Sequence, residues 1–96
     1  MQVTNINGTS GNACKCGDWL SHWKKHSGQP LPQFCSETRC AGNELVGAHV
    51  QKDGPGDKSW YIIPLCKRCN EAKGATLTVG DHVKLVPASG RSTCGA

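Results

Sequence analysis

The chain has 96 residues, seven of them cysteine, and a formal net charge of +4 at pH 7. Leu, Ile, Val and Phe together number only 16, which is too little apolar surface for a hydrophobic core to stabilise the domain unaided. No apolar run approaches the roughly 18 residues of a membrane span, and neither a phosphate-binding loop nor a nucleophile elbow is present. The sequence therefore predicts a single domain, residues 1–96, stabilised by metal or by disulfides.

The first residues, MQVTNINGTSGN, are polar and predict a flexible lead-in over 1–13, or at most a short edge strand around Val3 to Ile6. They contain neither the basic start nor the apolar segment of a signal peptide. We therefore expect a cytoplasmic protein, in which a reducing environment favours metal binding by the cysteines. The odd number of cysteines and their close pairing also favour metal, and disulfides are the alternative.

Residues 14–34 form a cysteine- and histidine-containing segment with a helix of about two turns. Asp18 is a good N-cap, and Gly28 is a good C-terminal stop. Large side chains at spacings of three and four then lie on one stripe of this helix. The stripe comprises Trp19, His22, Trp23 and His26.

The same segment suggests a second zinc site. Its candidate ligands are Cys14, Cys16, His22 and either His26 or His49. Two thiols and two imidazoles close in sequence form a common zinc set, and the spacing of His22 and His26 puts both rings on one helical face. His22 is preferred because it is nearer the cysteines in sequence. The alternative is that these histidines are hydrogen-bonded core or surface residues.

Two further cysteine pairs, Cys35-x4-Cys40 and Cys66-x2-Cys69, have the spacing that holds one tetrahedral zinc. Between the pairs, residues 44–51 and 59–65 are predicted strands of a hairpin, and a short helix over 66–73 should end at Gly74. The order of knuckle, hairpin and helix predicts an α+β treble-clef core over residues 35–74. The extension over 75–96 is predicted to be β-rich, with a second hairpin around Gly80-Asp81 or a short helix capped by Asp81.

The stretch from Cys35 to Lys73 resembles the HNH, or ββα-metal, superfamily of treble-clef domains. The resemblance rests on the two cysteine pairs, the histidine in GAHVQ, PLCKRC at the strand-to-helix junction and NEAK on the helix. In HNH nucleases the first histidine is the general base and an asparagine orients it. A last histidine or asparagine helps to bind a divalent ion at the scissile phosphate.

By position, the resemblance assigns these roles to His49, Tyr61 and Asn70. Ala48 stands where the family usually has a ligand of the catalytic ion, and Tyr61 stands where asparagine is expected. A base that lacks its orienting partner, beside an ion that lacks a ligand, is poorly placed to activate water. We therefore expect His49 and Asn70 to be catalytic only in a divergent endonuclease. In the alternative, His49 is a hydrogen-bonded filler of the hairpin.

Several basic residues are predicted to share the first knuckle and the short helix. They are Arg39, Lys67, Arg68 and Lys73. Such cations suit the phosphates of a nucleic acid, although interleaved glutamates allow a simple solvated face. Trp60 could stack on a base if exposed, and otherwise packs in the core. Cys94 is expected to be a free thiol in the tail.

These residues predict a small zinc-binding module of HNH-like fold that binds nucleic acid without cleaving it. It would hold one Zn²⁺, or two if the set around Cys14 also forms. The first alternative is a divergent HNH-type, metal-dependent DNA endonuclease. The second is a protein-interaction or inhibitor domain whose zinc is purely structural. No membrane partner is expected.

Overall fold

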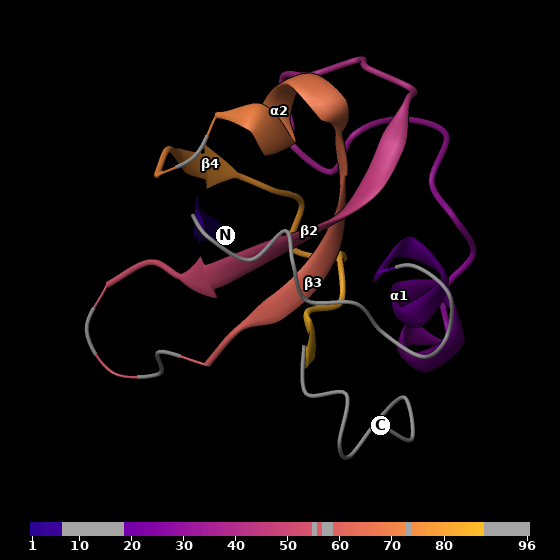
Figure 1. The fold of residues 1–96 in the computed structure, drawn as a ribbon, viewed down its shortest axis with the longest axis horizontal. Helices are drawn as coiled ribbons and strands as arrows, with labels where there is room; N and C mark the ends of the chain where they lie inside the picture. Colours follow the sequence, from indigo (N-terminus) through magenta and orange to yellow (C-terminus); the bar gives the residue numbers. More distant parts are fainter. Residues whose placement is uncertain (7–18, 55, 57–58, 73, 88–96) are drawn as a thin grey trace.

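Five antiparallel strands form one sheet in the computed structural model, which describes residues 1–6, 19–54, 56, 59–72 and 74–87. The strands are β1 (Gln2–Asn5), β2 (Leu45–Lys52), β3 (Tyr61–Cys66), β4 (Thr76–Thr78) and β5 (Val86–Pro87), in the order β4-β1-β2-β3-β5. Two helices, α1 (Trp19–Ser27) and α2 (Lys67–Glu71), complete the described part of the chain. Figure 1 shows α2 at one end of the sheet and α1 beside it. The fold is α+β, as predicted.

The predicted hairpin is confirmed as β2 and β3, paired from Leu45 opposite Cys66 to Val50 opposite Tyr61. Since successive side chains of a strand point to opposite faces, this register separates two sets of residues. Ala48 lies opposite Ile63 on one face, and His49 lies opposite Ile62 on the other. Both faces of the hairpin are therefore buried. The cysteines at the end of β3 lie next to the face that carries Ala48.

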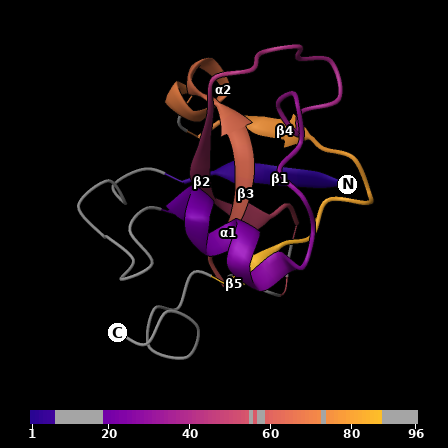
Figure 2. The ribbon, with the colours of Figure 1, turned by 90° about the vertical axis from the view of Figure 1, so that its right-hand side faces the viewer.

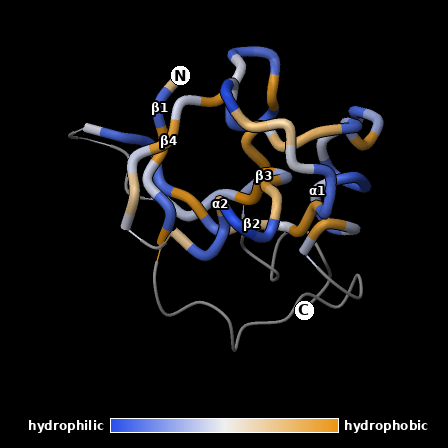
Figure 3. Tube along the Cα trace, turned by 90° about the horizontal axis from the view of Figure 1, so that it is seen from above, coloured by the Kyte–Doolittle hydropathy of each residue, from blue (hydrophilic) through white to orange (hydrophobic). Residues whose placement is uncertain are grey.

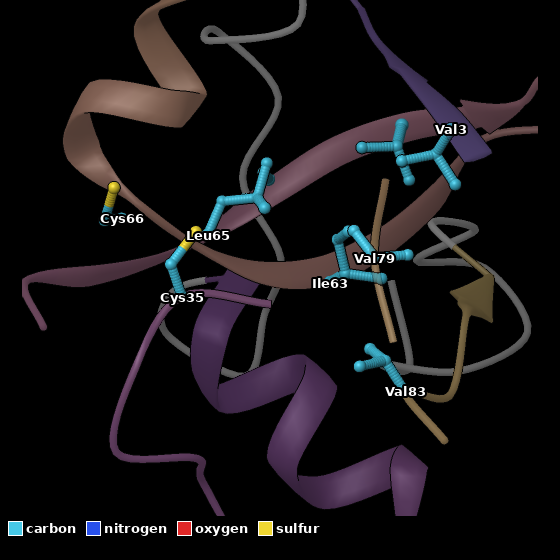
Figure 4. Packing of buried hydrophobic residues seen from close by; sticks show 9 residues of the cluster. Val3, Cys35, Ile63, Leu65, Cys66, Val79 and Val83 are labelled. Atoms are coloured by element: carbon cyan, nitrogen blue, oxygen red, sulfur yellow. The ribbon is translucent and has the colours of Figure 1, made fainter. Parts of the chain in front are cut away.

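The main core packs against the Ala48 face of the hairpin (Figure 4). Its buried members are Val3, Cys35, Ala48, Val50, Ile63, Leu65, Cys66, Val79 and Val83. Most of them are small or β-branched, and Figure 3 shows hydrophobic residues along β3. Two of the four paired cysteines are therefore part of the core itself.

Helix α1 covers the opposite face of the hairpin, and Figure 2 shows it in front of β2 and β3. The predicted stripe is confirmed in that Trp23 packs with Ile62 and Val86, while Trp19 packs against this cluster and His22 is fully buried. Gly28, at φ 71°, ends the helix in a left-handed conformation, as expected of a C-terminal stop. No helix in the described part of the chain is long and apolar enough to span a bilayer.

The short strand that the sequence allowed around Val3 to Ile6 is present as β1, but the prediction that it lies at an edge of the sheet is wrong. Residues 7–13 of the predicted flexible lead-in lie outside the described residues. Strand β1 is an interior strand, paired with β2 through Val3 opposite Lys52 and with β4 through Val3 opposite Leu77. Val3 and Asn5 are both buried, which is the alternation of a strand. The polar composition of this stretch gives little sign of a strand. Strand β1 is held in the sheet by hydrogen bonds to β2 and β4, which are far away in the sequence.

The predicted C-terminal hairpin is also wrong. Strand β4 pairs with β1 and strand β5 pairs with β3, so the two lie at opposite edges of the sheet. The residues between them cross the main core, where Val79 and Val83 are buried. Asp81 caps no helix; its carboxylate lies 2.6 Å from the N-terminal ammonium of Met1. The two alternating stretches do form strands, β4 and β5, but these two strands do not pair with each other.

Candidate metal centre

The first knuckle is a tight turn stabilised by its own backbone. The amide of Cys40 donates to the carbonyl of Glu37 at 3.1 Å, and the amide of Cys35 donates to the carbonyl of Gly42 at 2.8 Å. The Glu37 carboxylate accepts a further hydrogen bond from the amide of Arg39 at 3.0 Å. The amide of Ser36 bonds to the carbonyl of Pro64 on β3 at 3.1 Å, which fixes this turn beside the second cysteine pair.

The second knuckle is formed where β3 becomes α2. Cys66 is both the last residue of the strand and the N-cap of the helix, with an extended backbone at φ −71° and ψ 161°. Its sulfur accepts a hydrogen bond from the amide of Cys69 at 3.4 Å. The thiol thus takes the capping role usually filled by a serine or aspartate oxygen. The same bend turns Cys69 back toward Cys66.

The four sulfurs meet in one cluster. Their atoms all lie within 4.8 Å of one another, and the sulfurs of Cys40 and Cys66 are 3.5 Å apart. Sulfurs bound tetrahedrally to zinc at about 2.3 Å are about 3.8 Å apart, so the cluster fits one ion. All four cysteines are free of disulfides. Cys35, Cys40, Cys66 and Cys69 could therefore hold one zinc ion, as the sequence predicted.

The electrostatics of the cluster favour a cation. Burial raises the pKa of the Cys35 and Cys69 thiols, since a buried thiolate loses its hydration. Burial also acts to raise the pKa of Cys66, but hydrogen bonds from the Cys69 amide and from neighbouring thiols outweigh it and lower that pKa. Four thiolates cannot coexist at this distance without a compensating positive charge. A divalent ion supplies that charge and deprotonates the thiols that bind it.

Gly42 lets the two knuckles approach each other. A β-carbon at this position would lie 2.7 Å from the Cys66 β-carbon and 2.8 Å from its sulfur. It would also lie 3.4 Å from the sulfur of Cys40. The glycine is therefore required for space at the centre, between sulfurs from two different segments.

Asn5 supports the second knuckle from β1, and the sequence analysis missed it. Its side-chain amide donates to the carbonyls of Cys69, Asn70 and Ala72 at 3.0, 2.8 and 3.3 Å. These carbonyls belong to the end of α2, and those of Cys69 and Ala72 also accept from the backbone amides of Ala72 and Ala75, at 3.2 and 3.1 Å. Because three carbonyl oxygens face this group, its nitrogen and not its oxygen must point at them. The only sequence signal was the alternation with Val3, inside a stretch that otherwise resembles a linker.

Asn5→Ala should weaken zinc binding about tenfold or more. The substitution leaves the carbonyl of Cys69, a candidate ligand residue, without its side-chain donor, and partners of this kind typically contribute 10- to 100-fold to metal affinity. Competition with a chromophoric chelator measures the effect. Val3→Ala on the same strand is the matched control, because Val3 makes no hydrogen bond to α2. If the two variants lose the same stability and release zinc equally, Asn5 affects zinc binding only by holding β1 in the sheet.

A groove of about 690 Å³ opens beside the four cysteines. Exposed Arg39, Lys67 and Arg68 line it, from the first knuckle and from α2. Lys67 lies 3.5 Å from the carboxylate of Glu44, and both side chains are largely exposed. An exposed pair of this kind adds little stability, but it reduces the positive charge that Lys67 presents. The fourth predicted cation, Lys73, lies outside the described residues.

The candidate catalytic residues do not form a metal site with their neighbours. His49 is buried beneath α1, with its ring edge-on to Trp19 at 4.7 Å and to Trp60 at 6.0 Å between centroids. Tyr61 lies opposite Val50 on the other face of the hairpin, so it is not placed to orient His49. Asn70 is half-buried on α2. Among described residues, only the four cysteines form a group that could hold a metal.

The tryptophans divide between core and surface. Trp23 is buried, whereas Trp60 is 41% exposed at the start of β3. Trp60 therefore has an open face beside its contact with His49, and it lies far along the hairpin from the groove. Stacking of Trp60 on a base remains a prediction, separate from the charged residues near the cysteines.

The second zinc set stays a prediction, because Cys14 and Cys16 lie outside the described residues, as does Cys94. The Nε2 atom of His22 is 2.9 Å from the carbonyl oxygen of Pro87. An imidazole that donates Nε2–H to a carbonyl presents Nδ1 as the basic nitrogen, which is the usual arrangement around a bound metal. The rings of His22 and His26 lie 4.8 Å apart, and burial lowers the pKa of His26.

His22→Ala should lower the zinc content of the purified protein by one equivalent, because a four-ligand site that loses its buried nitrogen no longer retains the ion. Elemental analysis measures this content. His82→Ala removes an exposed imidazole from the turn before β5 and is the matched control. If His22→Ala leaves the zinc content unchanged, His22 is a packing residue and not a zinc ligand.

Comparison of the chain with family models, with curated proteins and with solved structures gives no match.

Proposed function

We propose that this chain is a zinc-stabilised treble-clef module that binds nucleic acid without cleaving it. The observation that carries the proposal is the position of three exposed cations, Arg39, Lys67 and Arg68, around one groove beside the four cysteines. The metal would be structural, since four cysteine ligands leave no open coordination position for a substrate. The order of knuckle, hairpin and short helix supports the treble-clef assignment.

The charge of the metal centre sets where phosphate would bind. Zinc held by four thiolates carries a net charge of −2, and Glu37 and Glu44 also line the groove. Phosphate would therefore be repelled from the floor and would contact the cations at the rim. Contacts to phosphate confer affinity without sequence information. We expect weak binding, with Kd of roughly 10⁻⁴ to 10⁻⁶ M, and a log–log salt slope of about −3 for three cations.

The proposal that the chain does not cleave nucleic acid is supported by the surroundings of His49. The ring lies against Trp19, and the side chain is only 6% exposed. Ala48 is fully buried in the main core, so it leaves no polar group at the position where the HNH family carries a ligand. General-base catalysis requires the imidazole to reach a water at the phosphate. This supports binding without hydrolysis.

Replacing Lys67 and Arg68 together by glutamate should abolish binding of a short DNA duplex at 50 mM salt. The double variant reverses two of the three rim charges, and both side chains are exposed, so the fold should persist. Fluorescence anisotropy of labelled DNA measures the effect. The double variant Lys24→Glu with Lys25→Glu, at two exposed positions of α1, reverses the same number of charges and is the matched control; it should lower the affinity much less.

Two results would replace this proposal. Cleavage of plasmid DNA that depends on Mg²⁺ or Mn²⁺ and disappears in His49→Ala would identify a divergent endonuclease. Binding that is absent, or that does not respond to salt, would favour the protein-interaction domain with structural zinc.

A further inference from the structure

The cluster of four sulfurs is accessible from one side. Three of the four cysteines, Cys40, Cys66 and Cys69, line the groove of about 690 Å³. Cys40 and Cys69 are half-buried, whereas Cys35 is 7% exposed and does not line the groove. A molecule as small as hydrogen peroxide could therefore reach the cluster from the groove. Thiolates that a small oxidant can reach are the ones that oxidise most readily.

Two of these sulfurs come from different knuckles and lie close together. The sulfur of Cys40 is 3.5 Å from the sulfur of Cys66, although the residues are 26 positions apart in the chain. A disulfide bond is about 2.05 Å long, so the two sulfurs would need to approach by roughly 1.5 Å. Gly42 leaves room beside both atoms, since a β-carbon there would lie 2.8 Å from the Cys66 sulfur and 3.4 Å from the Cys40 sulfur.

Backbone amides hold the two sulfurs in this arrangement. The amide of Gly42 donates to the sulfur of Cys40 at 3.4 Å, and the amide of Cys69 donates to the sulfur of Cys66 at 3.4 Å. Each sulfur of the pair is thus fixed by its own knuckle. A second thiol that already lies beside the first favours a disulfide over further oxidation of a single sulfur.

Cys66 and Cys69 are the alternative pair, because they lie three positions apart in one knuckle. A disulfide between them would close a single turn and would leave the first knuckle unattached. A disulfide between Cys40 and Cys66 would instead close the segment that contains the β2–β3 hairpin. Longer closed loops give a larger stabilisation. The bond between the knuckles is therefore the more stabilising product.

We propose that Cys40 and Cys66 are a peroxide-reactive pair, and that their disulfide replaces zinc as the link between the two knuckles. This inference goes beyond nucleic-acid binding, and only its zinc release rests on the metal site of the proposed function. An ion that loses two of its four ligands would be released, since a structural zinc site needs four. Chelation leaves four separate thiols, whereas oxidation leaves the knuckles covalently joined.

The reaction consumes one hydrogen peroxide for each disulfide. The Cys40 thiolate, the less buried of the pair, attacks one peroxide oxygen. An S–O bond forms, the O–O bond breaks, and the departing hydroxide takes a solvent proton to become water. The Cys66 thiolate then attacks the Cys40 sulfur, so that an S–S bond forms, the S–O bond breaks and a second hydroxide leaves as water with a second solvent proton. The two thiolates lose two electrons, and the peroxide is reduced to two waters.

The test treats the zinc-loaded full chain with one equivalent of hydrogen peroxide, alkylates the remaining thiols and digests the protein with trypsin without reductant. Cleavage after Arg39, Lys67 and Arg68 puts each of the four cysteines in a separate peptide. Mass spectrometry should find peptide 40–52 joined to peptide 59–67. A chromophoric indicator should report one equivalent of zinc released per cross-link, and dithiothreitol with added zinc should reverse both changes.

The oxidised, zinc-free protein should keep dispersed amide NMR signals, because the disulfide still joins the knuckles. Protein chelated in the presence of dithiothreitol should lose them. Cys94→Ser is the matched control and should form the same cross-link, since it removes a thiol outside the four candidate ligands.

A cross-link between peptides 59–67 and 69–73, or one that involves any other cysteine, would overturn the assignment of the pair. So would oxidation of either sulfur without a disulfide. Loss of dispersion on oxidation would overturn the replacement of zinc by the disulfide. A chain that forms the cross-link but binds no zinc would refute the metal site while supporting the reactive pair. Failure to bind DNA would refute the proposed function and leave the peptide map unchanged.

Discussion

Removal of zinc, by strong chelation or by Cys66→Ser, should unfold the protein. Structural zinc contributes on the order of 10 kcal/mol in small domains, which is comparable to the whole stability of a typical domain. Here two of the four candidate ligands, Cys35 and Cys66, belong to the main core, whose other members are mostly valine, isoleucine and leucine. Loss of the ion would leave buried thiols in a core too small to compensate. The amide NMR spectrum should lose its dispersion.

Cys94→Ser is the matched control for this experiment. It removes a thiol from the tail, outside the four candidate ligands, and should retain both zinc and a dispersed spectrum. A chelated protein that elemental analysis shows to be metal-free, and that still gives dispersed signals, would refute a structural role for the metal.

Gly47→Ala should destabilise the zinc-loaded protein by about 3 kcal/mol or more. A β-carbon at this position of β2 would lie 2.3 Å from the carbonyl carbon of Trp19 and 2.4 Å from the amide nitrogen of Leu20. Both are backbone atoms at the start of α1, so the whole helix would have to move away from the hairpin. Overpacking of this kind typically costs about 1–3 kcal/mol, and backbone contact leaves little scope for relaxation.

The midpoint of denaturant unfolding measures this loss, provided that the slope with denaturant stays unchanged. Gly80→Ala is the matched control, because the three atoms nearest to its β-carbon would all belong to the exposed ring of His82, the first at 2.6 Å. That ring can rotate away, so a much smaller loss is expected. If the two variants are equally stable, the contact between α1 and β2 is looser than the structure indicates.

Much of the centre of the fold could be predicted because its signals are local. Cysteine spacing determines which thiols a knuckle can bring together, and Cys35, Cys40, Cys66 and Cys69 do lie in one cluster. The stripe of Trp19 and Trp23 predicts α1 from helical periodicity alone. Likewise, β-branched residues on either side of a turn predict the β2–β3 hairpin.

The candidate site could be predicted only in part, because its supporting residues act over long distances in the chain. Asn5 reaches the end of α2 more than 60 residues away, and a single asparagine in a polar stretch carries no local sign of that contact. The groove beside the cysteines likewise forms between two segments, 37–44 and 66–69, that are separate in the sequence. Distances between their side chains depend on packing, which periodicity does not encode.

The sequence by itself determined the elements that hydrophobic period and ligand spacing define: α1, the hairpin and the four-cysteine set. Only the tertiary structure decided the neighbours of the strands outside this hairpin. Strand β1 became an interior strand between β2 and β4, while β4 and β5 separated to opposite edges of the sheet. The physical reason is that alternation specifies which face of a strand is buried, but backbone hydrogen bonds are nearly identical for every partner. The choice of partner therefore depends on how Val3, Val79 and Val83 fill the core shared with the cysteines.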